Sequence, residues 1–372
     1  MTYLSAFSET YADARAKFLA AATAAGAAIS SYEHEAQRGP QGERLYLDAA
    51  LLGAADAAKV LVVGCGTHGI EGYSGSAAQT HWLRRLASTG QALPTGTAVL
   101  FLHAHNPWGF AHALRFTEEN VDLNRNFIDF DQPLPANAGY PDVHALIARQ
   151  DWDDGAVDGI FERLSALRES IGEQAYSDAF NGGQYTHADG IFYGGVRQQW
   201  ANAAFRRAIG DHLAHADAAA IIDLHTGIGP ERGHVFLCFH PPGSPAYERA
   251  RAWWGERAVN REGVTHKAVA TYQGLLVDAF VAMLPRTETT AVVVEFGTLP
   301  RPRMQRASMA ARWLFATSGA TSSATPAADQ ALRERLLNDV REAFYPSAPD
   351  WRAGVLAQSE DIIDRAVAGL AG

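Results

Sequence analysis

Cysteine is scarce in this sequence. The 372 residues include two cysteines, Cys65 and Cys238, and both lie in apolar stretches. Two cysteines are too few for a disulfide framework, so we predict buried free thiols and a cytoplasmic protein. The sequence also has no uninterrupted apolar run of the ~20 residues that a membrane span needs. Its first residues, MTYLSAFSETYADARAKFLAA, do not show the basic start and apolar block of a secretory signal.

Positive charge is limited as well. The chain has 31 Lys and Arg residues against 41 Asp and Glu residues, which gives a net charge of -10, and it has no basic run. Phosphate binding needs concentrated positive charge, so we do not expect a nucleic-acid partner. Hydrophobic residues make up 47% and charged residues 19% of the chain, a globular composition. The length allows one large domain or two ordinary ones.

Short apolar runs alternate with longer amphipathic stretches along the chain. The runs rich in Val, Ile, Leu and Phe predict strands at 59–64, 98–104, 219–225, 233–239 and 290–296. The amphipathic stretches predict helices at 74–88, 156–180, 197–214, 244–260 and 301–316. Near-continuous apolar strands indicate burial on both faces of a sheet. The pattern therefore predicts an α/β fold with a mixed, mostly parallel central sheet and helices on both faces, with 45–53 as an added edge strand.

The C-terminal part begins with a change in composition. Residues 317–330 are rich in Ser, Thr and Ala and are predicted to form a loop or linker. Helical patterns follow at 328–343 and 350–370, and neither could hold a core of its own. We therefore predict a main domain at 1–316 and a C-terminal helical appendage, 317–372, packed on that domain.

Ligand-type side chains follow four of the predicted strands. In open α/β sheets, ligands bind where strands pass into loops at their carboxyl ends, and polar residues in such loops are a functional signal. The four strand ends carry Thr, His, Glu, Asn and Asp residues, at 67–71, 103–107, 223–227 and 294–297.

His68 and Glu71 are candidate metal ligands. The glycines around them allow a turn tight enough to bring both side chains to one cation, and His225 is a candidate third ligand. A catalytic zinc site uses three such ligands and keeps its fourth position for water. The alternative is that the His-x-x-Glu spacing arises by chance and that His225 is a hydrogen-bonded structural residue.

The segment ALRFTEENVDLNRNF is too polar for a core. Arg115 and Arg125 present planar donor forks suited to a carboxylate, and Asn124 adds amide donors. On composition alone, an ordinary surface loop with salt bridges to Glu118 and Glu119 is slightly favoured. A later segment, GGQYTHADGIFYGG (182–195), is predicted to be an ordered loop that could wall a cleft.

The combination of motifs resembles the zinc carboxypeptidase superfamily, which includes carboxypeptidase A-like peptidases, succinylglutamate desuccinylases and aspartoacylases. Within it, the pattern is most similar to a branch of uncharacterised bacterial predicted carboxypeptidases. The resemblance covers roughly residues 55–300 and implies a three-layer α/β fold. It rests on five motifs in order: His68-x-x-Glu71, HNPWG (105–109), DLNRNF (122–127), DLHTG (223–227) and VVEFGT (293–298).

The resemblance implies roles for the metal centre. His68, Glu71 and His225 would bind one Zn²⁺ ion, a metal that suits this ligand set. Glu295 would be the general base that takes a proton from water and passes it to the leaving amine. Arg115 would stabilise the developing oxyanion.

The resemblance also implies a substrate clamp. Asn124 and Arg125 would bind a free carboxylate, and Asp122 would orient a ligand histidine or Arg125. Tyr272 lies in the interval where classical members have a mobile tyrosine that reaches the substrate; a packing role is equally compatible with its position. Other histidines, His105 among them, receive no role and are expected to be structural.

Three functions remain open at this point. The leading one is a zinc-dependent hydrolase that cleaves an amide bond next to a free carboxylate, in a short peptide or small molecule. The second is an N-acyl amino acid deacylase of the desuccinylase or aspartoacylase kind. The third is a metal- or carboxylate-binding module without turnover, which would need neither Glu295 nor Arg115. We expect no membrane partner, and a homo-oligomer is left open.

Overall fold

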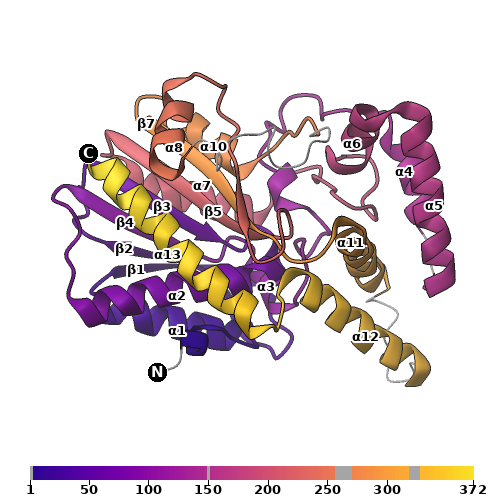
Figure 1. Ribbon diagram of the computed structural model, residues 1–372, viewed down its shortest axis with the longest axis horizontal. Coiled ribbons are helices and arrows are strands. Elements are labelled where there is room, and N and C mark those ends of the chain that lie inside the picture. The colour runs from indigo at the N-terminus through magenta and orange to yellow at the C-terminus, as the bar shows by residue number, and fades with distance from the viewer. Residues whose placement is uncertain (1–2, 149–150, 256–269, 318–326) are drawn as a thin grey trace.

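A computed structural model of the chain describes residues 3–148, 151–255, 270–317 and 327–372. Most of the linker expected at 317–330, and the end of the helix expected at 244–260, lie outside these residues. The described chain contains a seven-stranded sheet in the order β1-β2-β4-β3-β5-β7-β6 (Figure 1). Its strands are β1 (Ala28–Arg38), β2 (Arg44–Leu52), β3 (Lys59–Cys65), β4 (Thr97–His103), β5 (Ala218–Thr226), β6 (His234–Leu237) and β7 (Glu288–Phe296).

The four central strands are parallel. β3 pairs with β4 on one side and with β5 on the other, and β5 pairs with β7. Val62 of β3 therefore lies between Leu100 and Ile221, and all three are fully buried. Strands that are buried on both faces need nearly continuous apolar residues, and these apolar runs allowed the central strands to be predicted from the sequence. β1, β2 and β6 are antiparallel additions, so the predicted mixed α/β sheet is confirmed.

The strand expected at 45–53 exists as β2, but its predicted place at the sheet edge is wrong. β2 lies between β1 and β4, and β1 (Ala28–Arg38) forms the edge. The sequence of β1 is AISSYEHEAQR, and most of its residues are exposed. An edge strand with a mostly solvated surface has no apolar run, so periodicity gave no signal for it.

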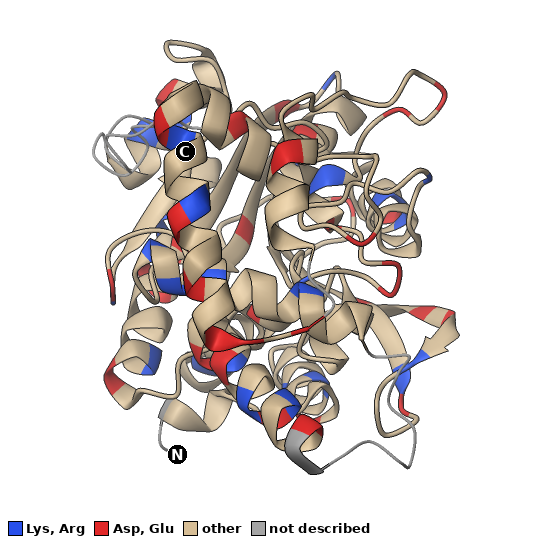
Figure 2. Cartoon of the chain, turned by 90° about the vertical axis from the view of Figure 1, so that its right-hand side faces the viewer, with Lys and Arg blue, Asp and Glu red and all other residues tan. Residues whose placement is uncertain are grey.

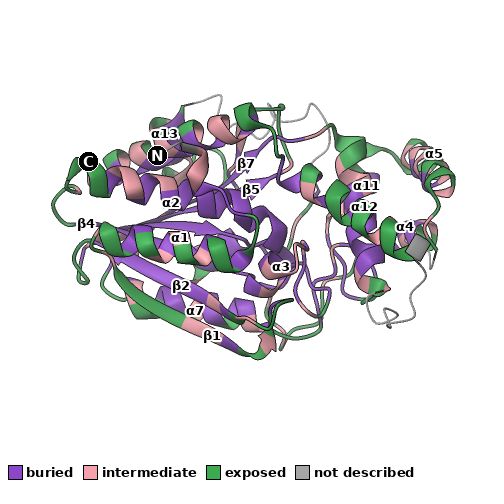
Figure 3. Cartoon of the chain, turned by 90° about the horizontal axis from the view of Figure 1, so that it is seen from below, coloured by how far each residue is buried: buried purple, intermediate pink, exposed green. Residues whose placement is uncertain are grey.

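Alternation along each strand supplies two cores, one on each face of the sheet. In β3, Leu61 and Val63 belong to one cluster, and Val60 and Val62 to the other. Helices α1 (Tyr11–Ala24), α2 (Gly72–Thr89), α8 (Pro245–Trp254) and α13 (Pro349–Ala371) cover the first face. Helices α7 (Trp200–Leu213) and α10 (Leu276–Met283) cover the second. Figure 3 shows the buried strands with α1 and α2 on one side and α7 on the other.

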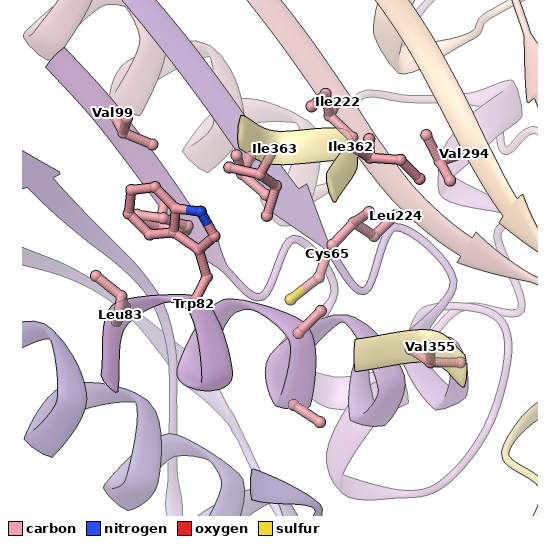
Figure 4. Close-up of a cluster of buried hydrophobic side chains, with 14 of the residues drawn as sticks. Cys65, Trp82, Leu83, Val99, Ile222, Leu224, Val294, Val355, Ile362 and Ile363 are labelled. Carbon is pink, nitrogen blue, oxygen red and sulfur yellow. The ribbon is translucent and has the colours of Figure 1, made fainter. Parts of the chain in front are cut away.

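The first core joins distant parts of the chain (Figure 4). Trp82 of α2 and Ile362 and Ile363 of α13 pack with the side chains of the central strands. The indole nitrogen of Trp82 donates a hydrogen bond to Asp364 of α13 at 2.8 Å, so the polar atom of this large buried side chain is satisfied. The C-terminal helix thus packs into the core of the sheet, while the predicted boundary between 316 and 317 stays a prediction. Cys65 and Cys238 are both buried, as expected.

A second group of helices lies beyond the carboxyl ends of the central strands, at the right of Figure 1. It consists of α4 (Tyr140–Ile147), α5 (Asp154–Ile171), α6 (Glu173–Asn181), α11 (Arg301–Ala316) and α12 (Ala327–Phe344). The single helix expected at 156–180 is wrong, because Gly172 (φ 85°) separates α5 from α6. Glycine adopts this left-handed backbone without the steric cost of a Cβ atom, so it ends the first helix.

The surface of this end carries mixed charge. Figure 2 shows acidic and basic positions interspersed along the helices that face the viewer. Within the described residues, the structure has no helix whose length and apolar character would let it cross a membrane.

Candidate active site

The carboxyl ends of β3 and β5 lie side by side at the centre of the sheet. From β3 the chain continues to one neighbour, β4, and later returns to the other neighbour, β5, so this pair marks a reversal of strand order. Such a switch point leaves a crevice at the strand ends in which ligands bind. His68 follows β3 in the turn before η2 (Gly69–Glu71), and His225 is the penultimate residue of β5.

Glycine makes the turn after β3 possible. A Cβ atom on Gly69 would lie 2.1 Å from the carbonyl carbon of Gly109, so a side chain at position 69 would clash with backbone. The turn is held by two backbone hydrogen bonds, from the amides of Gly69 and Ile70 to the carbonyls of Arg115 and Leu114. The close approach therefore fixes the His-x-x-Glu turn against the arginine segment.

Three side-chain groups converge at this point. Glu71 Oε1 lies 3.1 Å from His68 Nδ1, and Glu71 Oε2 lies 3.0 Å from His225 Nδ1. The two Nδ1 atoms are 3.1 Å apart, and the three groups offer ligand atoms within 4.8 Å of one another. All three residues are buried. Two imidazoles and one carboxylate form the donor set of a catalytic zinc site, so the residues present fit such an ion.

A carboxylate contacts the other nitrogen of each imidazole. His68 Nε2 lies 3.1 Å from Asp122 Oδ1, and His225 Nε2 lies 2.7 Å from Asp223 Oδ2. A carboxylate accepts a hydrogen there, which places the proton on Nε2 and leaves the Nδ1 lone pair facing the site. Both rings are therefore oriented as metal ligands, by residues that lie outside the predicted ligand set.

The electrostatics of the group follow from this arrangement. Burial alone would raise the pKa of Glu71, but His68, His225 and Arg115 hold that pKa well below its usual range. Burial likewise works against a charged His225, but the carboxylates of Asp223 and Glu71 raise the pKa of this histidine well above its usual value. The site thus concentrates negative charge around the imidazoles, which is the environment that a divalent cation requires.

Asp223 is held in turn by a buried network. The Thr67 hydroxyl donates to this carboxylate, with 2.9 Å to each oxygen. The same hydroxyl lies 2.8 Å from His105 Nδ1, and all three residues are fully buried. His105, to which no role was assigned, is therefore the outermost member of a network that ends on the candidate ligand His225.

Glu295 lies at the end of β7, in register with His225 on the adjacent strand. Its Oε2 accepts a hydrogen bond from the backbone amide of Ile228 at 3.2 Å. Burial, together with the charge of Glu71, raises the pKa of Glu295 to about 7 despite the opposing effect of His225. This carboxyl group can therefore exchange a proton near neutral pH.

Arg115 reaches the metal-ligand group. Its Nη1 donates to Glu71 Oε1 at 2.8 Å, and its Nη2 lies 3.4 Å from Asp122 Oδ2. Nη2 is also 2.7 Å from His68 Nε2. His68 Nε2 can make only one of these two contacts as a hydrogen bond. If it carries a hydrogen, it donates to Asp122; if it carries none, it accepts from Arg115. We assign the hydrogen to the carboxylate contact because that contact frees Nδ1 for a ligand.

The surface-loop alternative for the arginine segment is wrong. Glu118 pairs with His34 at 2.8 Å, and Glu119 pairs with Arg197, so neither glutamate forms the predicted salt bridge with Arg115. The segment folds inward, with Asn124 and Arg125 both buried.

Arg125 is held by backbone. Its Nη1 donates to the carbonyl of Asn124 at 2.7 Å, and its Nη2 to the carbonyl of Asn181 at 2.8 Å. A Cβ on Gly183 (φ 93°) would lie 2.5 Å from the Cδ atom of Arg125, so only glycine fits there. The buried Nε of Arg125 finds no hydrogen-bond partner among the described residues. Asn124 is fixed through its Oδ1, which accepts from the amide of Leu276 at 2.8 Å.

One cavity of about 480 Å³ joins these groups. All the predicted site residues except Glu71 and Asp122 line it: His68, Arg115, Asn124, Arg125, His225, Tyr272 and Glu295. Glu71 lies behind this wall and contacts both histidines. The ring centroid of Tyr272 is 4.7 Å from the guanidinium carbon of Arg125. The structure therefore brings every predicted site residue to one place.

Other parts of the wall were missed by sequence reasoning. Met304 of α11 and Phe344 of α12 line the cavity beside Gly227. The Thr226 hydroxyl donates to the carbonyl of Phe344 at 2.6 Å, which ties the end of α12 to the end of β5. In sequence, apolar side chains on amphipathic helices are indistinguishable from ordinary core residues, so nothing in the local sequence identified Met304 and Phe344 as cavity residues. Phe192, in the loop predicted to wall the cleft, also lines the cavity.

The fold and the site define a class: an α/β protein with a His-Glu-His group that could hold a metal ion at the carboxyl edge of its sheet. Residues 7–358 match the model of one family, described as "Protein of unknown function (DUF2817)", and the chain belongs to this family. A search of curated proteins gave no match.

Solved structures with a similar chain trace were also found. Bovine thrombin-activatable fibrinolysis inhibitor, in complex with tick carboxypeptidase inhibitor, is 12% identical over 90% of this chain and 96% of that chain, with a TM-score of 0.45. Carboxypeptidase A from Helicoverpa armigera is 12% identical over 95% and 73% of the chains, with a TM-score of 0.44. The succinylglutamate desuccinylase from Chromobacterium violaceum is 16% identical over 89% and 74%, with a TM-score of 0.38.

A carboxypeptidase A and a succinylglutamate desuccinylase, two of the groups that the sequence motifs resemble, are thus among the structures found. The function proposed below rests on the residues of this chain.

Proposed function

We propose that this protein is a zinc-dependent hydrolase that cleaves an amide bond next to a free carboxylate. The observation that carries the proposal is the convergence of His68 Nδ1, His225 Nδ1 and the Glu71 carboxylate within 4.8 Å, on the wall of a cavity that Glu295 and Arg125 also line. A zinc ion held by these three groups supplies Lewis-acid chemistry and lowers the pKa of water.

Glu295 is the proposed general base. It lines the cavity next to His225, and its pKa of about 7 lets it take a proton from the attacking water and return it to the leaving amine. The apolar strand before it supplies the burial that raises this pKa. A carboxyl group with an ordinary pKa would hold the transferred proton less well at neutral pH.

Arg115 is the proposed stabiliser of negative charge. Its guanidinium borders the metal-ligand group and lines the cavity, so positive charge is present where the carbonyl oxygen of a substrate would gain negative charge. A positioned charge in a site with restricted access to water can contribute several kcal/mol to the barrier.

Arg125 and Asn124 form the proposed carboxylate clamp. Two backbone carbonyls hold the guanidinium of Arg125 while its buried Nε has no partner among the described residues. A buried, charged donor of this kind costs free energy unless a ligand satisfies it. Tyr272, whose ring lies beside the same guanidinium, is a proposed contact of the bound carboxylate end.

An N-acyl amino acid deacylase is the second candidate. It would use the same residues, with the clamp holding the carboxylate of the released amino acid. The observation that favours it is the short interval between Arg115 and Asn124, which resembles the desuccinylase and aspartoacylase side of the superfamily. In either case the proposed substrate is a small molecule or short peptide, and we propose a cytoplasmic location because the chain has only two cysteines, both buried.

The test is turnover with a defined metal content. Zinc-loaded protein is assayed for amine release against short peptides and N-acyl amino acids, in parallel with Glu295→Gln. The matched control is Glu288→Gln, at the exposed start of the same strand. We expect Glu295→Gln to bind zinc and to lose turnover by at least about a hundredfold, while Glu288→Gln keeps both. Full activity in Glu295→Gln would show that the base is assigned wrongly, and zinc-loaded protein without turnover across the library would favour a binding module.

A further inference from the structure

Phe192 has an unusual backbone conformation for its residue type. Its φ is 52°, in the left-handed region. A bulky side chain is an outlier there, because its Cβ crowds the backbone. Residues in such conformations persist where their surroundings fix them, and they concentrate at functional sites.

The loop around Phe192 is well fixed. The carbonyl of Phe192 accepts from the amide of Gln184 at 3.1 Å, and the amide of Gly194 donates to the carbonyl of Gln184 at 2.8 Å. The carbonyl of Tyr193 accepts from the amide of Asp122 at 2.7 Å, which ties the loop to the arginine segment. The backbone at Phe192 is therefore anchored at the strained position and directly after it.

The Phe192 ring lies close to both arginines of the proposed site. The ring centroid lies 5.5 Å from the guanidinium carbon of Arg115 and 5.6 Å from that of Arg125. Both distances are within the range of cation–π attraction. Phe192 also lines the cavity and meets Phe180 edge to face, at 6.2 Å between centroids.

We propose that Phe192 is a positioning and specificity-determining residue of this site. Its ring sets the placement of Arg115 relative to Arg125, and it forms the wall against which the apolar part of a substrate packs, between the scissile amide and the clamped carboxylate. This role rests on the proposed function, because it assigns Arg125 to the carboxylate. The preferred substrates are accordingly carboxylates that carry an apolar side chain next to the amide.

The decisive experiment measures binding as well as turnover. Dissociation constants of N-acetylphenylalanine and N-acetylglycine are measured by calorimetry on zinc-loaded Glu295→Gln protein, which is expected not to turn them over, with Phe192 kept or replaced as Phe192→Gly or Phe192→Tyr. Glycine suits the left-handed backbone, so Phe192→Gly is expected to keep the wild-type melting temperature and zinc content. We expect it to weaken N-acetylphenylalanine binding by about tenfold and N-acetylglycine binding by less, because only the former contacts the wall. Phe192→Tyr keeps the ring and is expected to remain within about threefold of wild type.

The matched control is Ile191→Ala. Ile191 is the preceding loop residue, it is buried in the apolar cluster against which Phe192 packs, and it is not part of the cavity wall. This variant is expected to lower the melting temperature and to leave both dissociation constants unchanged. If Phe192→Gly weakens binding no more than Ile191→Ala does, or weakens both ligands equally, the proposed wall does not exist.

The outcome separates this inference from the proposed function. Binding of both carboxylates with the expected Phe192 effect, together with wild-type protein that releases no amine from any substrate, contradicts the hydrolase and supports the role of Phe192. If neither carboxylate binds when Phe192 is kept, the inference about Phe192 itself is overturned.

Discussion

Replacing Asp223 with asparagine is predicted to weaken zinc binding strongly while the fold is kept. The Asp223 carboxylate accepts from His225 Nε2 at 2.7 Å and is held by the Thr67 hydroxyl. It therefore keeps the imidazole proton on Nε2 and the Nδ1 lone pair toward Glu71, which lies 3.0 Å away. Asparagine has nearly the same size as aspartate, but its amide group can donate to Nε2 and so favour the opposite tautomer, with a proton on Nδ1.

The expected magnitude follows from the role of this contact. Removing a partner of this kind from a metal-ligating histidine lowers metal affinity by about 10- to 100-fold, which corresponds to about 1.4 to 2.7 kcal/mol. The amide oxygen of the introduced asparagine can still accept from Thr67, so we expect only a modest change in the stability of the metal-free protein. The effect should therefore appear in the metal affinity rather than in the folding equilibrium.

The assay is a competition titration of zinc against a chromophoric chelator at pH 7.5, with melting curves of the metal-free proteins. Asp211→Asn, an exposed aspartate on α7, serves as the control. Because zinc must displace the proton that the raised pKa of His225 retains, the affinity of wild type is also expected to rise with pH. Zinc affinity of Asp223→Asn within threefold of wild type would refute the orienting role of this carboxylate.

The remaining predictions test other parts of the account. Burial raises the Glu295 pKa from 4.5 to about 7, so the metal-free protein should lose stability as the pH rises from 4.5 through 7. At pH 8, Glu295→Gln should therefore have a free energy of unfolding about 3 kcal/mol higher than that of wild type, measured by chemical denaturation. The base must be ionised to act, so kcat/KM should fall as pH drops below about 7, and an unchanged rate at pH 5 would exclude Glu295. Gly69→Ala should abolish zinc binding measured by titration, because its Cβ would meet the Gly109 backbone at 2.1 Å. Ile363→Ala should cost about 2 to 5 kcal/mol of unfolding free energy and leave zinc affinity unchanged; a changed affinity would mean that the α13 core reaches the site.

The site could be predicted from sequence because its residues follow buried strands. His68 follows the buried strand β3, and His225 and Glu295 lie at the ends of β5 and β7; parallel strands that are buried on both faces bring their carboxyl ends to one edge. The polar segment that contains Arg125 does not directly follow a buried strand, so its position could not be predicted in this way. Composition favoured a surface loop, and only the ordered motifs pointed to its burial in the cavity.

Other features had no sequence signal, for identifiable physical reasons. The edge strand β1 is mostly solvated and therefore polar, so no periodic pattern marked it. The break between α5 and α6 depends on a left-handed Gly172 within an otherwise helical pattern. Met304 and Phe344 reach the cavity through long-range packing, and their local sequence is typical of ordinary apolar residues.

The most direct test of the central claim is a crystal structure of zinc-loaded protein with anomalous diffraction data collected on both sides of the zinc absorption edge. The account predicts one zinc peak per chain, within about 2.0 to 2.2 Å of His68 Nδ1, His225 Nδ1 and a carboxylate oxygen of Glu71. An anomalous peak bound by other residues, or no peak at these three side chains, would contradict it.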